Sequence, residues 1–201
     1  LDEYYLLSSK TAVALYEDIK GLPIIDAHNH CDVKALSENR NFDDIWQAEG
    51  STDHYVWECL RKRGVAEPYV TGERSNKDKW LAMATIFPDL VGNPTYEWVH
   101  LDLKRILGID DLICEENAES IWKQSKAVLQ QPEMRQQEMI KGMNVEAMCS
   151  TDDPIDSLEY HRRLDSSLIP GVVRPTFRPD RAMNIFKPDW REYIGLLENR
   201  V

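Results

Sequence analysis

Two histidines and an aspartate stand at alternate positions in one short segment. Asp26, His28 and His30 are each separated by a single residue. In an extended strand, side chains at i, i+2 and i+4 point to the same side, so these groups would face the same way. Two imidazole nitrogens and a carboxylate oxygen are typical ligands of a divalent metal. The spacing fits a metal site, but it also fits surface histidines at a strand end, because His-x-His occurs by chance.

A short apolar segment must position these residues. Leu22, Ile24 and Ile25 are apolar, and Gly21 and Pro23 flank them. The segment is too short for a helix and contains β-branched residues. It therefore predicts a short buried strand that turns polar at its carboxyl end.

Two more strands are predicted later in the chain, at 145–149 and 171–177, with helices at 155–164, starting at Pro154, and at 190–197. Strands that alternate with helices are typical of a parallel sheet with helical crossovers. Polar clusters follow all three strands, the later two at 150–153 and 178–180. In a β/α barrel the active site lies at the carboxyl ends of the strands. The three clusters together indicate a functional site more strongly than any one alone.

The segment between the first two strands, 33–142, has helical patterns nearly throughout. Ser51, Ser75 and Asn93 are capping residue types near the starts of three predicted helices. Five of the six tryptophans lie in this segment, and aromatic residues at helical spacing usually belong to a core. A further amphipathic helix is predicted at 3–20.

Asp53, His54 and Tyr55 stand in the first turn of a predicted helix, 51–63. Backbone donors and the helix dipole favour an anion at that place. The imidazole and the phenol could hydrogen-bond a carboxylate or a sugar hydroxyl. The alternative is that Asp53 caps the helix and that His54 is solvated.

Charged residues also follow the later strands. Asp152 and Asp153 come after the second strand and could be functional, or they could form ordinary turn and cap contacts. Arg178 follows the third strand and could hold a carboxylate through two hydrogen bonds. It could equally pair with Asp180 or Asp153.

Composition narrows the range of partners. A net charge of −11 leaves little positive charge to neutralise nucleic acid or an anionic membrane. No stretch approaches the ~18 apolar residues of a membrane span, and the first five residues predict no signal peptide. The four cysteines form no Cys-x-x-Cys pair. Four free thiols in a reducing cytosol are expected. Cys31 directly follows His30 and could lie near a metal, but a packed thiol is the favoured interpretation.

Five segments resemble the uronate isomerase (glucuronate isomerase) family of the amidohydrolase superfamily. They are Pro-Ile-Ile-Asp-Ala-His-Asn-His at 23–30, Asp-His-Tyr at 53–55, Gly-Asn-Pro-Thr-Tyr-Glu-Trp-Val-His-Leu-Asp-Leu-Lys-Arg at 92–105, Cys-Ser-Thr-Asp-Asp-Pro-Ile-Asp-Ser-Leu-Glu-Tyr-His at 149–161 and Thr-Phe-Arg-Pro-Asp at 176–180. The resemblance covers the N-terminal part of the family's sequence. It implies an α/β fold: part of a (β/α)8 TIM-type barrel of the amidohydrolase kind, with a large helical insertion after the first strand. It also implies interconversion of D-glucuronate with D-fructuronate, and of D-galacturonate with D-tagaturonate.

The resemblance also assigns ligand-binding roles. The family's His-x-His metal ligands fall on His28 and His30, and the implied cofactor is one divalent ion, usually Zn²⁺. Its arginine in the motif Trp-Arg-Pro-Asp falls on Arg178, with Phe177 here in place of tryptophan. Arg178 would hold the uronate carboxylate, and Asp152 is a further substrate-binding candidate.

The family's substrate-binding His-Tyr pair falls on His54 and Tyr55, which are also the candidate catalytic residues. Aldose–ketose isomerisation moves a proton between neighbouring carbons through an enediol(ate). It needs an acid and a base near the substrate and an electrophile for the developing oxyanion. Tyr55 could move a proton between oxygens.

Length is the main departure from the family. The family's chain is roughly twice as long as this one, and a complete barrel needs about 250 residues. The expected divisions are 1–32 with the first strand, 33–143 as the helical insertion, and 144–201 with the second and third strands. The family's last-strand aspartate has no counterpart here. We expect an exposed sheet edge and no normal isomerase activity from this chain alone.

Two other functions fit the same residues. One is a metal-dependent hydrolase on this scaffold, because His-x-His is common to both. The other is a non-catalytic helical domain that binds a partner. The expected partners are a small uronate and either a second copy of the chain or a complementary C-terminal half, without nucleic acid or membrane.

Overall fold

The computed structural model describes residues 3–200. Leu1, Asp2 and Val201 lie outside the described residues. They stand at the ends of the first and last expected divisions. By contacts, the described chain forms two units. The helical unit comprises residues up to 16 together with 41–135, and the sheet unit comprises 17–40 together with 136–200. The division at 1–32, 33–143 and 144–201 stays a prediction.

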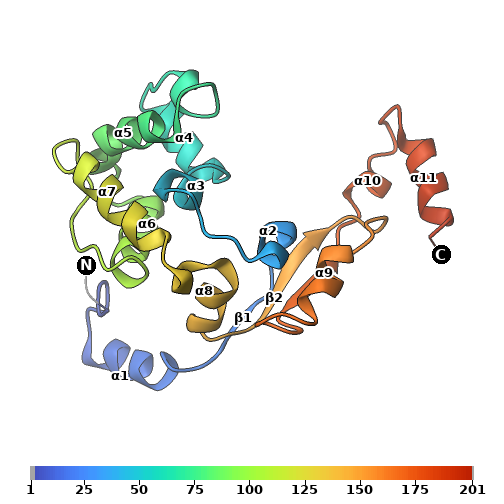
Figure 1. Cartoon of the computed structure of the whole chain (residues 1–201), viewed down its shortest axis with the longest axis horizontal. Helices are drawn as coiled ribbons and strands as arrows, with labels where there is room; N and C mark the ends of the chain where they lie inside the picture. Colours follow the sequence, from blue (N-terminus) through green and yellow to red (C-terminus); the bar gives the residue numbers. More distant parts are fainter. Residues whose placement is uncertain (1–2, 201) are drawn as a thin grey trace. The chain divides into compact units, whose positions relative to one another are not determined.

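The sheet unit contains, among the described residues, three parallel strands in the order β1 (Ile24–Asp26), β2 (Val145–Asp152) and β3 (Val173–Phe177) (Figure 1). This agrees with the predicted parallel arrangement and makes β2 the central strand. Its helices are α2 (Val33–Glu38), α8 (Gln136–Gly142), α9 (Glu159–Leu164), α10 (Asp180–Met183) and α11 (Trp190–Glu198).

A small core joins the sheet to α2 and α9. It consists of Leu36, Met148, Leu164, Ile169 and Val173, all less than 9% exposed. Because α2 and α9 both contribute a leucine to it, they hold β2 and β3 in place. This core fixes the strand ends that carry the polar clusters.

The apolar residues around β1 are exposed, so the prediction of a buried strand is wrong. Leu22, Ile24 and Ile25 are 61%, 49% and 68% exposed. Within residues 3–200 the strand is hydrogen-bonded on one side only, to β2, and the five core residues lie on other segments. The composition of residues 22–25 predicts a strand, but it does not show whether other strands cover both edges of that strand.

The helical unit is built from capped helices. Ser75 and Asn93 accept backbone N–H bonds as predicted, and Asp53, rather than Ser51, caps the helix that begins at His54. Its main helices are α3 (Ile45–Glu49), α4 (His54–Lys62), α5 (Asn76–Ile86), α6 (Pro94–Arg105) and α7 (Ala118–Leu129). Its large buried side chains include Ile45, Trp46, Leu60, Trp80, Leu103 and Ile121.

Some boundaries and burial differ from expectation. The first helix, α1, covers Lys10–Ile19 rather than 3–20, and it runs across the boundary between the units. Trp98 is 50% exposed, although its helical spacing predicted a core position.

The helix after β2 begins later than predicted. Pro154 does not start it, because Asp153 forms a turn instead: its Oδ1 accepts from Ile155 N–H, and its carbonyl accepts from Asp156 N–H. The chain enters α9 only at Glu159.

Helices of residues 3–200 are all too short or too polar to cross a membrane. The four cysteines, all within this range, are free.

Candidate functional site

The carboxyl ends of the strands carry most of the predicted site residues. Because β1, β2 and β3 are parallel neighbours, these ends lie at one edge of the sheet. His28 and His30 follow β1, Asp152 ends β2, and Arg178 follows β3. The backbone N–H of Arg178 donates to the carbonyl of Asp152 at 3.0 Å. The sheet therefore gathers the three polar clusters that the sequence placed after strands.

The imidazoles of His28 and His30 converge, although β1 ends before them. Their Nε2 atoms are 3.0 Å apart, and the rings meet edge to face with centroids 4.7 Å apart. Asp26 does not face them, contrary to the strand alternation. Its Oδ1 accepts from the backbone N–H of His28 at 3.1 Å, and its Oδ2 accepts from Asn29 Nδ2 at 2.7 Å. The chain leaves the extended conformation at Asp26, so this carboxylate shapes the loop.

Two imidazole nitrogens at this separation fit two corners of a tetrahedral metal site. With Zn–N bonds of about 2.0–2.1 Å, neighbouring tetrahedral ligands lie about 3.3 Å apart. Both histidines are exposed, so an ion could reach them. Within residues 3–200 no group of three or more His, Cys, Asp or Glu side chains is arranged to hold a metal. The pair thus offers two ligands, and a tetrahedral ion would need two more.

Asn29, between the two histidines, ties their loop to β2. Its backbone N–H donates to the carbonyl of Cys149 at 2.7 Å, and its carbonyl accepts from Thr151 Oγ1 at 2.8 Å. Its Oδ1 accepts from the backbone N–H of Cys31 at 2.7 Å. These bonds hold the loop against the central strand, which explains how two exposed imidazoles stay paired.

Cys31 is a packed thiol, as predicted. It is half-buried against the core of the sheet unit. Burial raises the pKa of its thiol to about 11, with a smaller contribution from the negative charge of Asp152. The thiol is therefore neutral at pH 7 and a poor nucleophile.

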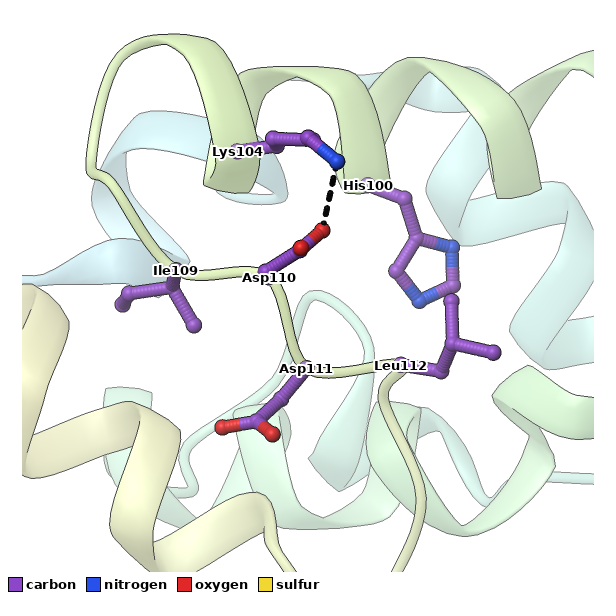
Figure 2. A pocket seen from close by; sticks show the side chains of 6 residues that line it. All are labelled: His100, Lys104, Ile109, Asp110, Asp111 and Leu112. Carbon is purple, nitrogen blue, oxygen red and sulfur yellow. Dashed lines mark ion pairs between the residues drawn. The ribbon is translucent and has the colours of Figure 1, made fainter. Parts of the chain in front are cut away.

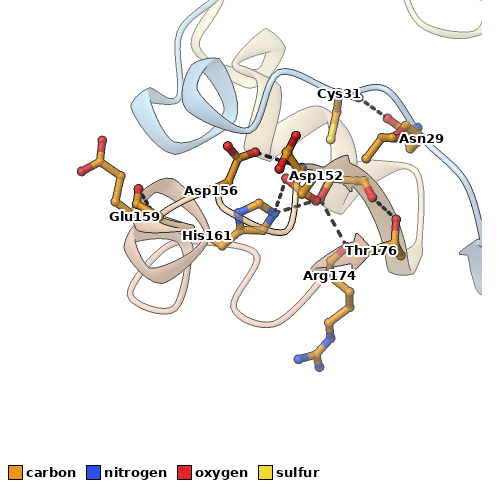
Figure 3. Close-up of polar contacts among 12 residues, drawn as sticks. Asn29, Cys31, Asp152, Asp156, Glu159, His161, Arg174 and Thr176 are labelled. Atoms are coloured by element: carbon orange, nitrogen blue, oxygen red, sulfur yellow. Dashed lines mark hydrogen bonds and ion pairs between the residues drawn. The ribbon is translucent and has the colours of Figure 1, made fainter. Parts of the chain in front are cut away.

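Asp152 is held by two residues that the sequence patterns do not single out, Ser150 and His161. Figure 3 shows His161 beside Asp152. Ser150 Oγ lies 2.7 Å from Asp152 Oδ2 and 2.8 Å from His161 Nε2. His161 Nε2 lies 3.6 Å from Asp152 Oδ1. Ser150 is 1% exposed. The available signal is the i, i+2 spacing of Ser150 and Asp152, which puts both on one face of β2.

Serine, histidine and aspartate also form hydrolytic triads, but this arrangement differs from one. In a triad, the serine and the carboxylate contact opposite nitrogens of the imidazole. Here both approach Nε2, and Ser150 is out of reach of a substrate. The cluster therefore holds a carboxylate and does not activate a nucleophile.

Arg178 and Asp153 both have protein partners. Arg178 Nε donates to Asp180 Oδ2 at 2.7 Å, one of the two ion pairs that the sequence left open. Asp153 Oδ1 accepts from the hydroxyl of Tyr193 at 2.9 Å, and its Oδ2 lies 3.7 Å from Arg181 Nη1. Asp153 therefore anchors α11 to the loop after β2.

His54 and Tyr55 lie in the helical unit, at the exposed first turn of α4. Asp53 Oδ1 accepts from the backbone N–H groups of Tyr55 and Val56 at 2.7 and 3.3 Å, so Asp53 is a cap that occupies donors an anion would use. The rings of His54 and Tyr55 have centroids 4.2 Å apart, and Trp98 meets Tyr55 edge to face at 6.0 Å. The three rings form an exposed aromatic group.

Two carboxyl groups near this turn have raised pKa values. Burial raises the pKa of Glu49 well above its usual range, and the charges of Asp102 and Asp53 add to the effect. Burial also raises the pKa of Asp102 to about 6, although Arg105 opposes the shift. Asp102 therefore takes up a proton as the pH falls through about 6.

A small cavity in the helical unit is not a substrate site (Figure 2). Its volume of about 10 Å³ gives room for one water molecule at most. His100, in its wall, is 3% exposed. Its Nδ1 donates to the carbonyl of Tyr96 and its Nε2 accepts from Ile113 N–H, both at 2.8 Å. His100 is therefore a neutral structural residue.

Comparison with known proteins gives a consistent result. A family model for glucuronate isomerase matches residues 1–201. The chain is 53% identical over 194 residues to a uronate isomerase of Thermotoga neapolitana, covering 96% of this chain and 43% of that protein. It is 52% identical over 200 residues to that of Thermotoga maritima, covering 100% and 44%.

Solved structures agree. The crystal structure of the Thermotoga maritima uronate isomerase matches with a TM-score of 0.94 at 52% identity, over 100% of this chain and 44% of that one. The glucuronate isomerase of Caulobacter crescentus matches with a TM-score of 0.87 at 23% identity, over 96% and 42%, which shows a shared fold only. The chain thus spans less than half the length of these relatives. Because the family model matches all 201 residues, the chain belongs to the glucuronate isomerase family.

Proposed function

We propose that this chain is the N-terminal part of a uronate isomerase that interconverts D-glucuronate with D-fructuronate and D-galacturonate with D-tagaturonate. The observation that carries the proposal is the pair of converging imidazoles, His28 and His30, at the carboxyl end of β1 in a chain of this family. The chemistry is a proton transfer between neighbouring carbons, which needs an acid, a base and stabilisation of an oxyanion.

His28 and His30 would hold one divalent ion, with Zn²⁺ as the first candidate. When bound, it would supply positive charge next to the oxygen on which negative charge develops. The Nε2 separation of 3.0 Å supports this assignment. The two imidazoles would have to be unprotonated at Nε2 to bind it, which gives metal affinity a dependence on pH.

Arg178 would bind the uronate carboxylate. Its Nε donates to Asp180 Oδ2, and among the hydrogen bonds within 3–200 none comes from its two Nη groups. These Nη groups could therefore form the paired hydrogen bonds that carboxylates favour. Asp152, at the end of the neighbouring strand, would accept from a sugar hydroxyl.

His54 and Tyr55 would bind the sugar and move its proton. Tyr55 is 52% exposed, so its hydroxyl can reach a ligand. Trp98 offers an apolar ring beside it. A phenol can donate and accept a proton between sugar oxygens.

The fold proposal is a partial (β/α)8 barrel in which residues 33–143 form the insertion after the first strand. A complementary C-terminal part would pair with a strand edge and cover β1, whose apolar side chains are exposed. Assembly with a second copy is the other possibility. A cytoplasmic location is part of the proposal, because the cysteines within 3–200 are all free.

The test is complementation. The purified chain is mixed with the part of the Thermotoga maritima relative that it does not cover, and conversion of D-glucuronate is followed by NMR. We expect no turnover by the chain alone, turnover by the mixture, and loss of that turnover in His28→Ala. No turnover in a mixture that forms a stable complex would overturn the proposal and favour the partner-binding module. Hydrolysis of ester or amide substrates instead would favour the hydrolase.

A second variant tests the carboxylate contact. Arg178→Lys keeps the charge but loses the paired geometry, so KM for D-glucuronate should rise at least about tenfold in the active mixture. Arg163→Lys is the matched control, because the Arg163 guanidinium lies over the ring of Tyr160, 4.9 Å from its centroid, and has no proposed contact with substrate. An equal change in both variants would remove Arg178 from the site.

A further inference from the structure

The hydroxyl of Ser150 lies at the centre of a hydrogen-bond network at the end of β2. Figure 3 shows its partners Asp152, His161 and Arg174. A serine hydroxyl donates one proton and accepts with two lone pairs. Its Oγ lies 2.7 Å from Asp152 Oδ2, 2.8 Å from His161 Nε2 and 3.3 Å from the carbonyl of Arg174. A carboxylate and a carbonyl can only accept. The carboxylate is closer and charged, so the proton of Ser150 points to Asp152.

This assignment fixes the tautomer of His161. If the Ser150 proton is given to Asp152, then Ser150 Oγ must accept a proton from His161 Nε2. The bonds then run in one direction, from His161 Nε2–H to Ser150 Oγ–H to Asp152 Oδ2. Hydrogen bonds in such a chain polarise and strengthen one another.

The network is buried, so it can hold a side chain in one orientation. Ser150 is 1% exposed, and the side chains of His161 and Asp152 are 11% and 14% exposed. The carbonyl of Asp152 also accepts from Arg178 N–H. Asp152 is therefore fixed twice: Ser150 bonds its side chain, and Arg178 bonds its main chain.

We propose that Ser150 and His161 are positioning residues for the substrate-binding carboxylate of Asp152. This inference rests on the proposed function. Ser150 holds Oδ2, which leaves Oδ1 to accept from a hydroxyl of the uronate. Ser150 is too deeply buried to touch the sugar, and His161 acts through Ser150. Without the network, Asp152 would rotate among its staggered rotamers.

The first test is the tautomer of His161 in the 201-residue chain, read from ¹⁵N shifts of labelled histidine at mildly alkaline pH. We expect the Nε2–H tautomer in the wild type and a mixture of tautomers in Ser150→Ala. Ser125→Ala is the control, because Ser125 is also fully buried but donates within its own helix in the helical unit. An Nδ1–H tautomer, or no change in Ser150→Ala, overturns the proposal.

The second test uses kinetics of the complemented enzyme. His161→Leu should raise KM for D-glucuronate about tenfold, because a hydrogen bond that orients a charged group is lost. His161→Gln should stay within about threefold, because its amide can still donate to Ser150. A fall in kcat with KM unchanged in His161→Leu would mean a loss of folded enzyme and would overturn the positioning role.

The two tests separate this inference from the proposed function. Absence of isomerisation by a wild-type mixture that forms a stable complex rejects the proposed function, and with it the substrate role of Asp152. The tautomer result still decides whether Ser150 and His161 hold that carboxylate.

Discussion

Histidines in this chain take opposite roles according to what contacts their ring nitrogens. Both nitrogens of His100 are bonded to the backbone inside the helical unit, so it is committed to structure. His28 and His30 are exposed and face each other, so their Nε2 atoms could bind a ligand. Residue type alone does not separate these cases.

His100 makes stability depend on pH. Burial lowers its pKa below the ordinary value of 6.5, so the unfolded chain takes up a proton that the folded chain resists. Its contribution to stability is therefore present above pH 6.5 and is lost as the pH falls below it. We expect the difference in urea midpoint between the wild type and His100→Gln to be larger near pH 7.5 than near pH 5.5.

Asp102→Asn serves as the opposing control. The pKa of Asp102 is raised to about 6, so its stabilising effect is present at low pH and is lost as the pH rises through about 6. The wild type should lose stability relative to Asp102→Asn on going from about pH 4 to about pH 7. A wild-type advantage over His100→Gln that grows toward low pH would contradict the assignment.

Among helices and strands, features that depend on residues nearby in the sequence could be predicted. Features that depend on contacts between distant parts of the chain could not. Ser75 and Asn93 cap helices as expected, because a cap needs only the next few residues. Burial of Ile25 was predicted wrongly, because it depends on which strands lie on either side of β1.

The same distinction applies to the candidate site. His28 and His30 could be found from their spacing, which is local. His161 could not, because it comes from α9 and reaches Ser150 and Asp152 on β2 across the turn that Asp153 begins. That helix begins at Glu159 and not, as predicted, at Pro154. The sequence pattern therefore could not show which side of the helix carries His161.

The cap of α4 can be tested by substitution. Asp53→Ala removes an acceptor shared by two backbone N–H groups and should cost about 1 kcal/mol of unfolding free energy. Asp53→Asn keeps an acceptor oxygen and should cost less than half of that. Asp43→Ala, at an exposed aspartate in the same unit, is the control in urea titrations. Equal losses in Asp53→Ala and Asp53→Asn would mean that charge, not capping, matters at this position.

At the scale of the whole molecule, each unit has its own core. The core of the sheet unit is five residues, whereas the helical unit buries several large side chains, including Trp46 and Trp80. Less buried apolar surface means less hydrophobic stabilisation. We therefore expect the sheet unit to open first.

Hydrogen exchange tests this order. Leu164→Ala should destabilise the sheet unit by about 2–5 kcal/mol and speed exchange in β2 and β3, with α5 and α7 unchanged. Leu103→Ala, at a similarly buried leucine, should speed exchange in α5 and α7. Acceleration of all these elements by either variant would show that the chain unfolds as a single unit.

The position of β1 also has a kinetic consequence. Residues 27–144 separate it from β2, while only 153–172 separate β2 from β3. Closing the longer loop costs more entropy, so β1 should join the sheet last. Asn41 Nδ2 donates to the carbonyls of Leu129 and Gln131, both at 2.7 Å, so folding of the helices brings the two ends of the long loop together. The rate at which β1 pairs with β2 then depends on folding of the helical unit. A destabilising substitution in the helical unit would therefore slow strand pairing in the sheet.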